Sequence, residues 1–385
     1  MKNQTWLSLN YFAFFFTWGV FMPYWTGWLV DSKGLTVQAA SAVIGAGFIS
    51  RSISTLLVFP AFCRHKSIAF LLKIFPIISA ILLFLFLPFT SVNILTAIMV
   101  FFTILYPLIL PLMESTGTMM VKADGIHYGK SRRWGSIGYT VALIVVGIIT
   151  SIYKNQAIFY IMAFGMLLMM VTTNLKSPPS INNKIGGEKG SSYKGLFQSK
   201  RFLLGLVIAI LLQGAHASYN NYGFLYLQDL HVDNFYIGFI LNIAVIAEII
   251  FFSVADRFFQ KTSIPIMFII AGIGSVVRWL VIFIFPSAIV FIAMQLLHSL
   301  TFGLTHYTLI RLINEELRQQ DIPAAQAVYT SIGMGLIVGI FTYLGGFLYS
   351  HSPGLAFGGM SLFALPCIFI AAYMHVHQKK IAQAM

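Results

Sequence analysis

Long apolar runs separated by short polar loops constrain this chain more than any other feature of its sequence. An α-helix rises 1.5 Å per residue, so about 20 apolar residues cross the roughly 30 Å of hydrocarbon in a bilayer. Only 9% of the residues are charged and 58% are hydrophobic. In soluble domains about a quarter of all residues are charged, so this composition excludes a soluble core. We expect an all-α, multi-pass membrane protein.

The lengths of the apolar runs place twelve spans on the sequence. The first six lie at residues 6–30, 36–60, 67–87, 91–113, 133–152 and 157–174. The second six lie at residues 202–228, 235–255, 263–284, 287–312, 323–350 and 352–374. A transmembrane β-barrel would show alternating segments of about ten residues, so the bundle is predicted to be helical.

A polar, Gly-rich stretch at residues 176–201 separates the two sets of spans. Such a composition buries little apolar surface and is typical of a flexible linker. We therefore predict an N-terminal six-helix bundle at residues 1–175, a cytoplasmic linker at 176–201 and a C-terminal six-helix bundle at 202–385.

The positions of the basic residues predict the topology. The chain has 24 Lys and Arg residues and a formal net charge of +13. With both termini in the cytoplasm, only Lys33 and Lys154 fall in outer loops, while Arg51, Lys73 and Arg278 fall within spans, away from the span ends. All the others lie on the inner side, as the positive-inside rule requires for a protein of the inner (cytoplasmic) membrane. This topology accounts for the net charge, so no nucleic-acid partner is expected.

The sequence has none of the common motifs for catalysis, nucleotides or metals. Cys63 and Cys367 lie in separate apolar segments without CxxC spacing, so neither a disulfide framework nor a zinc site is expected. There is no GxxxxGK[ST] loop, and neither GxSxG nor HExxH occurs. We expect no cofactor and no enzymatic activity, and an ion gradient rather than ATP must drive any transport.

Several ionisable residues fall inside or at the ends of the predicted spans. A charged side chain at the bilayer centre costs about 2.5–3.5 kcal/mol, so each such residue is a candidate functional group. The candidates are Arg51, Glu114, Arg132 and Arg133 in the first half, and Glu248, Arg278, His298 and His306 in the second. The alternative for Arg51, Arg278 and Glu248 is a structural ion pair. Glu248, Arg278 and His298 lie on three successive predicted spans, and so many ionisable side chains are more than helix packing alone requires.

The seventh span carries polar residues with helical spacing. Gln213, His216 and Asn220 fall on one face of a continuous helix, close to Tyr219, and that face should line a cavity. Aromatic walls could come from Tyr222 and Tyr226 of the same span and from Trp18, Tyr24, Trp25 and Trp28 of the first. Interfacial belts use the same residue types, and they explain Tyr226 and Trp28 better.

The segment from Gly129 to Tyr139, together with its spacing back to Glu114, resembles the start of the fifth helix in the oligosaccharide:proton symporters, the lactose permease family. That resemblance implies that Glu114 and Arg132 bind substrate and that Tyr139 stacks against it. It also places Glu248, Arg278 and His298 in the positions of the coupling apparatus. The proton-carrying glutamate of that family is replaced here by Thr301.

A resemblance over most of the chain links it to the phenylpropionate transporter group of the major facilitator superfamily. The segments that carry this resemblance are Leu211–Tyr219, 245–250, 276–279 and 296–298. It implies proton-coupled uptake of a small aromatic carboxylate, with a cavity between the two halves that opens alternately to each side.

These observations give one preferred function and one alternative. We expect a monomer that carries a small aromatic carboxylate together with protons across the lipid bilayer. Substrate binding is assigned to Arg51, Glu114, Arg132, Tyr139, Gln213, His216, Tyr219 and Arg278, and proton coupling to Glu248, His298 and Arg278. The alternative is a sugar or nucleoside proton symporter, in which Glu114 and Arg132 would bind hydroxyls.

Overall fold

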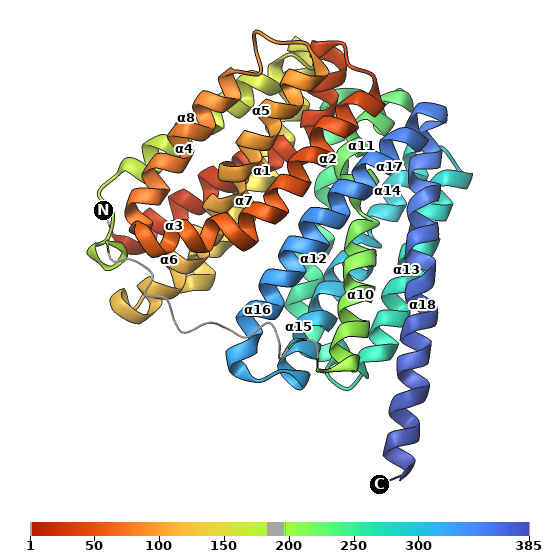
Figure 1. Cartoon of the computed structure of the whole chain (residues 1–385). Coiled ribbons are helices and arrows are strands. Elements are labelled where there is room, and N and C mark those ends of the chain that lie inside the picture. The colour runs from red at the N-terminus through yellow and green to blue at the C-terminus, as the bar shows by residue number, and fades with distance from the viewer. Residues whose placement is uncertain (1, 183–195, 197, 385) are drawn as a thin grey trace. The chain divides into compact units, whose positions relative to one another are not determined.

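The computed structural model describes residues 2–182, 196 and 198–384, with side chains described as far as His377 (Figure 1). In these ranges all of the regular structure is helical. Most of the predicted linker, residues 183–195 and 197, lies outside the described residues. The division at residues 175 and 202 therefore stays a prediction.

The chain clusters into two compact units. Within the described residues, one unit comprises residues 2–182 together with 232–242, and the other comprises residues 196, 198–231 and 243–384. The long helix α12 is thus shared, with its first nine residues in the first unit and the remainder in the second.

The helices of the first unit match the first six predicted spans. They are α1 (Asn3–Lys33), α2 (Val37–Ile53) with η1 (Ser54–Val58) and α3 (Phe59–His65), α4 (Ile68–Phe84), α5 (Val92–Leu105) with η2 (Tyr106–Leu108) and α6 (Ile109–Asp124), α7 (Tyr128–Tyr153) and α8 (Ala157–Asn174), followed by the short η3 (Pro179–Ile181).

The remaining helices match the second six predicted spans. They are α10 (Lys200–Gly214) with α11 (Ala217–Asp229), α12 (Asn234–Phe259), α13 (Ile264–Ile284), α14 (Ala288–Gln295) with η4 (Ser299–Gly303) and α15 (Leu304–Glu316), η5 (Gln319–Asp321) with α16 (Ile322–Val328), η6 (Tyr329–Leu336) and α17 (Ile337–His351), and α18 (Pro353–Ala384).

Ten of these helical segments are long and apolar enough to cross a membrane. The other two are α4, an apolar helix of 17 residues, and α1. Although α1 has 31 residues, its Asn, Thr, Trp and Tyr residues make it less apolar than the rest. At 1.5 Å per residue it is still long enough to span the hydrocarbon core. The prediction of twelve membrane-spanning helices is therefore supported by ten apolar spans and two further helices.

The fourth span is longer than the sequence predicts. Helix α6 continues past residue 113 to Asp124 and ends at Gly125, which has a φ of +63°. Glycine adopts this left-handed conformation without a steric penalty. The helix therefore continues through the polar residues after residue 113 and ends only at this glycine. Glu114 consequently lies within a helix rather than at its end.

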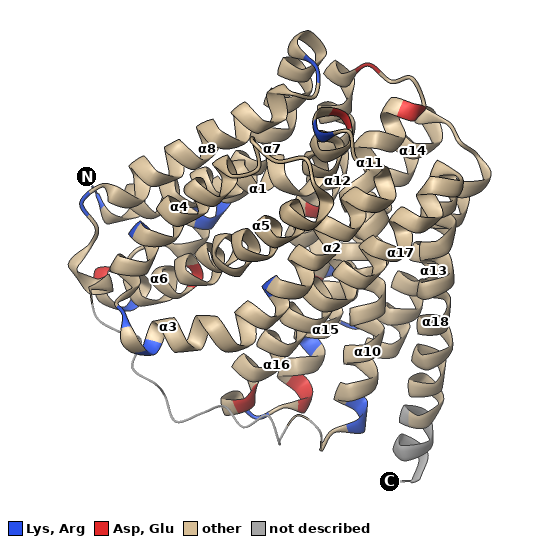
Figure 2. Ribbon diagram, turned by 45° about the horizontal axis from the view of Figure 1, so that its top comes forward, with Lys and Arg blue, Asp and Glu red and all other residues tan. Residues whose placement is uncertain are grey.

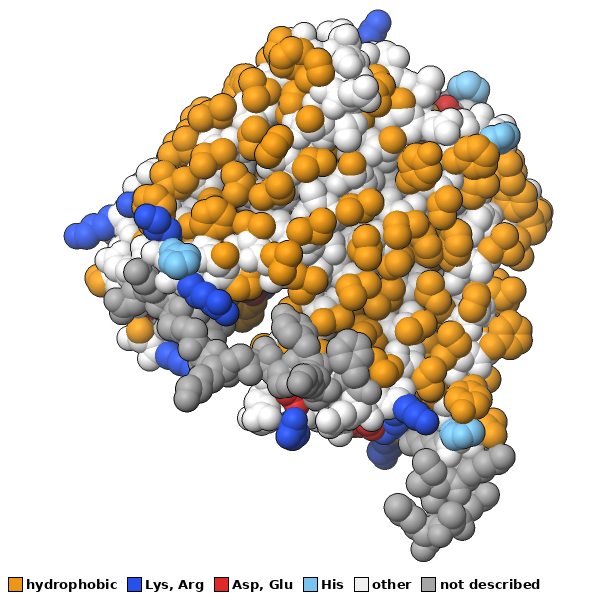
Figure 3. All heavy atoms as spheres, in the orientation of Figure 1, with side chains coloured by type: hydrophobic (Ala, Val, Ile, Leu, Met, Phe, Trp, Pro, Cys, Tyr) orange, Lys and Arg blue, Asp and Glu red, His pale blue; other side chains and the backbone are white. Residues whose placement is uncertain are grey.

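Large apolar side chains cover the flanks of the helices. Leu57, Ile289 and Phe369 are exposed by 68%, 78% and 67%, respectively. Figure 3 shows hydrophobic side chains spread over the visible helices, with charged side chains mainly at the margins. Figure 2 likewise shows most charged residues near helix ends and few within the helices. Apolar exposure on this scale would aggregate in water, and lipid is the solvent that it fits.

Candidate functional site

Arg278 is the centre of a buried polar cluster in the second unit. Its side chain lies on α13 and is fully buried. Nη1 donates to Nδ1 of His298 at 3.1 Å and to Oγ1 of Thr301 at 3.0 Å, while Nη2 donates to Oε1 of Gln295 at 3.0 Å. The guanidinium also lies over the rings of Trp279 and Tyr219, at 4.3 and 4.9 Å. Its partners in this cluster are thus neutral groups.

His298 connects this arginine to an acid. Nε2 of His298 lies 3.5 Å from Oε2 of Glu248 on α12. Because a guanidinium can only donate, Nδ1 of His298 must accept the hydrogen bond from Arg278. The imidazole proton is therefore on Nε2, where it faces the Glu248 carboxylate. In this arrangement His298 is neutral, and it can take up a second proton at Nδ1 only after Arg278 moves away.

Thr301 connects the same arginine to His216. Oγ1 of Thr301 lies 2.9 Å from Nε2 of His216, whose Nδ1 lies 2.9 Å from the carbonyl oxygen of Leu212. A carbonyl can only accept, so Nδ1 carries the proton of His216. Thr301 then accepts from Arg278 and donates to Nε2 of His216. One continuous line of hydrogen bonds runs from α13 through η4 to the break between α10 and α11.

That break changes the predicted face of the seventh span. The span is not one regular helix, because α10 ends at Gly214 and α11 begins at Ala217. Gln213, His216 and Tyr219 nevertheless meet the same cluster. Nε2 of Gln213 donates to the carbonyl of Phe302 at 3.4 Å, and the ring of Tyr219 lies 5.6 Å from that of His298.

A second cluster, in the first unit, contains Glu114 and Arg132. Nε of Arg132 donates to Oε1 of Glu114 at 3.1 Å, and the hydroxyl of Tyr128 donates to Oε2. The guanidinium lies 4.3 Å from the centre of the Phe15 ring. The side chains of Arg132 and Glu114 are 35% and 36% exposed, so this pair is less buried than Arg278.

Tyr139 lies two turns beyond Arg132 on α7 and is half-buried. A Cβ atom on Gly19 of α1 would lie only 2.9 Å from the carbonyl oxygen of Tyr139, which shows how closely α1 and α7 pack.

Two further candidates lie outside these clusters of contacts. The side chain of Arg133 is exposed. Nδ1 of His306 lies 3.3 Å from the hydroxyl of Tyr329 on η6.

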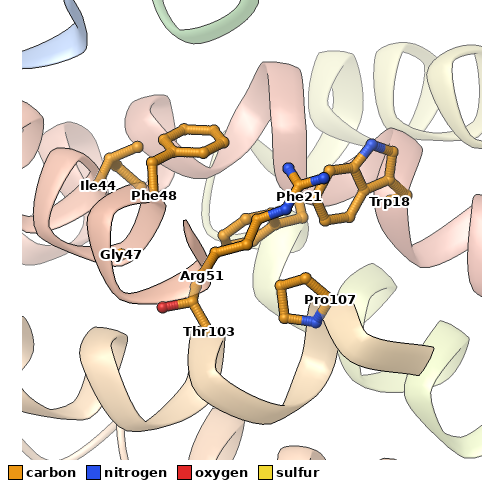
Figure 4. Close-up of a pocket in the computed structure, with 8 residues that line it drawn as sticks. All are labelled: Trp18, Phe21, Ile44, Gly47, Phe48, Arg51, Thr103 and Pro107. Atoms are coloured by element: carbon orange, nitrogen blue, oxygen red, sulfur yellow. The ribbon is translucent and has the colours of Figure 1, made fainter. Parts of the chain in front are cut away.

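Arg51 lines a pocket of the first unit. It is near the middle of the segment Val37–His65, and its guanidinium lies 5.0 Å from the centre of the Trp18 ring. Figure 4 shows its side chain extending from α2 toward Trp18, beside Phe21 and Pro107. Phe48 and Thr103 also line this pocket.

Arg51 makes no ion pair with the described acidic residues and donates no side-chain hydrogen bond within the described part of the chain, in contrast to Arg132 and Arg278. A cation–π contact contributes about 0.5–2 kcal/mol, against a cost of about 2.5–3.5 kcal/mol for a charged side chain at mid-membrane. The contact with Trp18 therefore offsets only part of the cost of placing Arg51 there.

Sequence reasoning missed two residues of these clusters. Gln295 lies three residues before His298, and an amide in so apolar a run was a usable signal. Tyr128 lies fourteen residues after Glu114 across a turn, and no spacing rule connects them.

Three π-helical turns were also not predicted from the sequence. They are η1, which begins three residues after Arg51, η4, which begins directly after His298, and η6, which begins at Tyr329. Such turns occur frequently at functional sites.

A bundle of membrane-spanning helices with charged clusters inside its spans defines a class of protein, the polytopic membrane proteins with buried functional polar groups. Residues 4–358 match the MFS_1 like family, so the chain belongs to this family of the major facilitator superfamily. It is a secondary transporter, and the prediction that it is no enzyme is confirmed by this membership.

Curated relatives extend this result. The chain is 28% identical over 374 residues to the "probable 3-phenylpropionic acid transporter" of Escherichia coli, covering 96% of this chain and 97% of that protein. It is 24% identical over 348 residues to the maltose permease of Geobacillus stearothermophilus, covering 90% and 88%. The predicted resemblance to phenylpropionate transporters is thus confirmed.

A solved structure supports the fold. The crystal structure of the nucleoside transporter NupG matches with a TM-score of 0.80 at 16% identity, over 98% of this chain and 99% of that one. At this identity the match concerns the fold alone, and it agrees with the major facilitator fold expected from the sequence.

Proposed function

We propose that this protein takes up a small aromatic carboxylate together with protons across the cytoplasmic membrane, by alternating access, with both termini in the cytoplasm. The observation that carries this proposal is the line of contacts from Arg278 through His298 to Glu248 inside the spans. An acid and an imidazole held in apolar surroundings are the groups from which proton relays in transporters are built.

Glu248 is the proposed proton carrier. His298 already accepts a hydrogen bond from Arg278 at Nδ1, whereas the Glu248 carboxylate is approached by the Nε2 proton of His298. Protonation of Glu248 requires no loss of the Arg278 contact. Protonation of His298 requires that Arg278 first withdraw, so His298 is the alternative carrier in a second conformation.

The substrate class rests on the arginines and on the curated relative. An anionic substrate explains why the spans hold Arg51, Arg132 and Arg278, and the name of the Escherichia coli relative specifies an aromatic acid. The proposed substrate-binding residues are Arg51, Glu114, Arg132, Tyr139, Gln213, His216, Tyr219 and Arg278. The proposed state is a monomer.

The second candidate is a sugar or nucleoside proton symporter. It is favoured by the pairing of Glu114 with Arg132 and Tyr128, because a carboxylate and a guanidinium side by side can bind the hydroxyls of a neutral substrate. One of the curated relatives is a maltose permease.

Uptake into proteoliposomes with an imposed pH gradient separates these candidates. The panel is labelled phenylpropionate, benzoate, maltose and uridine. We expect accumulation of an aromatic acid that stops when a protonophore collapses the gradient. Accumulation of maltose or uridine alone would favour the second candidate, and accumulation that ignores the protonophore would contradict proton coupling.

A further inference from the structure

Arg51 differs from the other arginines of the spans in its surroundings. Arg132 has Glu114 as an acidic partner, and Arg278 donates to Gln295, His298 and Thr301. Within the described part of the chain, Arg51 has no acidic partner and donates no side-chain hydrogen bond. Its charge is located midway along a membrane-spanning segment.

The pocket around Arg51 has two kinds of wall. The guanidinium faces Trp18 at 5.0 Å, and the other lining side chains include Phe21, Phe48 and Pro107, which are apolar. The Tyr106 ring packs against two of these aromatic side chains, with its centre 5.9 Å from that of Trp18 and 5.7 Å from that of Phe21. The hydroxyl of Tyr106 is already engaged, because it donates to Thr17 at 2.7 Å. The pocket therefore offers one unsatisfied cation beside aromatic surface.

We propose that Arg51 binds the carboxylate of the substrate, and that the aromatic ring packs against Trp18, Phe21 and Phe48 after these side chains have moved apart, because the pocket as it stands is too small for the ring. The planar guanidinium fits a carboxylate through two parallel hydrogen bonds. The bound anion supplies the missing counter-charge. This proposal rests on the proposed function and deepens it, because it identifies Arg51 as the arginine whose counter-charge, among the described residues, is left to the substrate.

The chemistry of Arg51 predicts a specific preference. Phenylpropionate and phenylpropionamide have the same ring and nearly the same shape, and only the first carries a charge. An arginine without a protein acid should favour the acid strongly, and removal of the guanidinium should sharply reduce that preference while binding to the aromatic side chains persists.

The test is equilibrium binding of labelled phenylpropionate, with phenylpropionamide as competitor, to the purified full chain in detergent. The variants are Arg51→Gln and Arg51→Lys, with Arg133→Gln as the control that removes an exposed charge from the same unit. A charge-assisted hydrogen bond corresponds to about 10- to 100-fold in affinity. We expect Arg51→Gln to weaken acid binding by that factor and to leave amide binding unchanged.

The remaining outcomes separate the two proposals. Arg51→Lys, which keeps the charge without the fork, should fall between wild type and Arg51→Gln and guards against a variant that fails to fold. Wild type that binds neither acid nor amide would overturn the proposed substrate class. If the wild type prefers the acid and Arg51→Gln keeps the same preference, the assignment of Arg51 is overturned while the proposed substrate class stands.

Discussion

Oγ1 of Thr301 lies 2.9 Å from Nε2 of His216, although the two residues are 85 positions apart in the sequence. The same hydroxyl accepts from Nη1 of Arg278 at 3.0 Å. Thr301 thus joins a cation to a neutral imidazole. A carboxylate here would neutralise Arg278, whereas the hydroxyl leaves the charge in place.

Thr301→Val should destabilise the second unit. Valine keeps the volume of threonine but leaves the donor of Arg278 and the acceptor of His216 without a partner. Burial of such groups costs about 1–3 kcal/mol, and thermal unfolding in detergent measures the loss. Thr308→Val is the control, because its buried hydroxyl bonds only within its own helix, to the carbonyl of Leu304 at 2.6 Å. Equal shifts in both variants would contradict the role of Thr301.

Glu248→Gln should separate exchange from accumulation. The substitution removes the titrating group and keeps the shape and an oxygen facing His298. We expect equilibrium exchange of substrate to continue, because it needs no net proton movement, while uphill uptake driven by a pH gradient is lost. Counterflow and gradient-driven uptake in the same proteoliposomes measure the two processes.

Asp256→Asn is the matched control for Glu248→Gln. Asp256 lies on the same helix, α12, and accepts a hydrogen bond from Tyr307 at 2.8 Å. This variant should retain both exchange and accumulation. If Glu248→Gln accumulates substrate fully, the proton carrier is His298 or transport is not proton-coupled.

Arg132→Lys should weaken substrate binding without altering topology. Lysine keeps the charge near Glu114 but lacks the planar fork that can hold a carboxylate or two hydroxyls. We expect binding to fall by about tenfold, the equivalent of one charge-assisted hydrogen bond. Arg133→Lys, at the exposed neighbouring position, should bind as wild type does. Unchanged binding in Arg132→Lys would limit this residue to a role in topology.

Gly238→Ala should lower the melting temperature. A Cβ atom at Gly238 would lie 2.1 Å from the carbonyl oxygen of Leu143, so α7 and the start of α12 would have to separate. Overpacking of this kind costs about 1–3 kcal/mol. Gly129→Ala is the control, because a Cβ atom there meets nothing within 4 Å. A melting temperature unchanged by Gly238→Ala would show that the two helices separate without cost.

The sequence predicted helix positions well because membrane spans are defined by hydrocarbon thickness, a property that composition reveals directly. The end of α6 was predicted about ten residues too early. Hydropathy falls after residue 113, but backbone hydrogen bonding continues until Gly125 adopts a left-handed conformation. Length and polarity locate a span, whereas the capping residue locates the end of its helix.

The clusters were harder to predict than the spans. The cost of a charge in lipid singled out Arg278, Glu248 and His298, and these residues do lie together. Their partners depend on how separate helices pack, so the contact of Gln295 with Arg278 could not be derived from either helix alone. The isolation of Arg51 from any described acid is likewise a property of packing.

The π-helical turns have a consequence for how the spans can be compared among relatives. A π-turn holds one residue more than an α-helical turn, so each residue beyond it is rotated by about 100° relative to an uninterrupted helix. Helix η1 thus lets the residues before Ser54 and those after Val58 face different neighbours within one span. Against a relative whose span is α-helical throughout, a single-residue gap at such a position would keep equivalent faces of the two helices aligned.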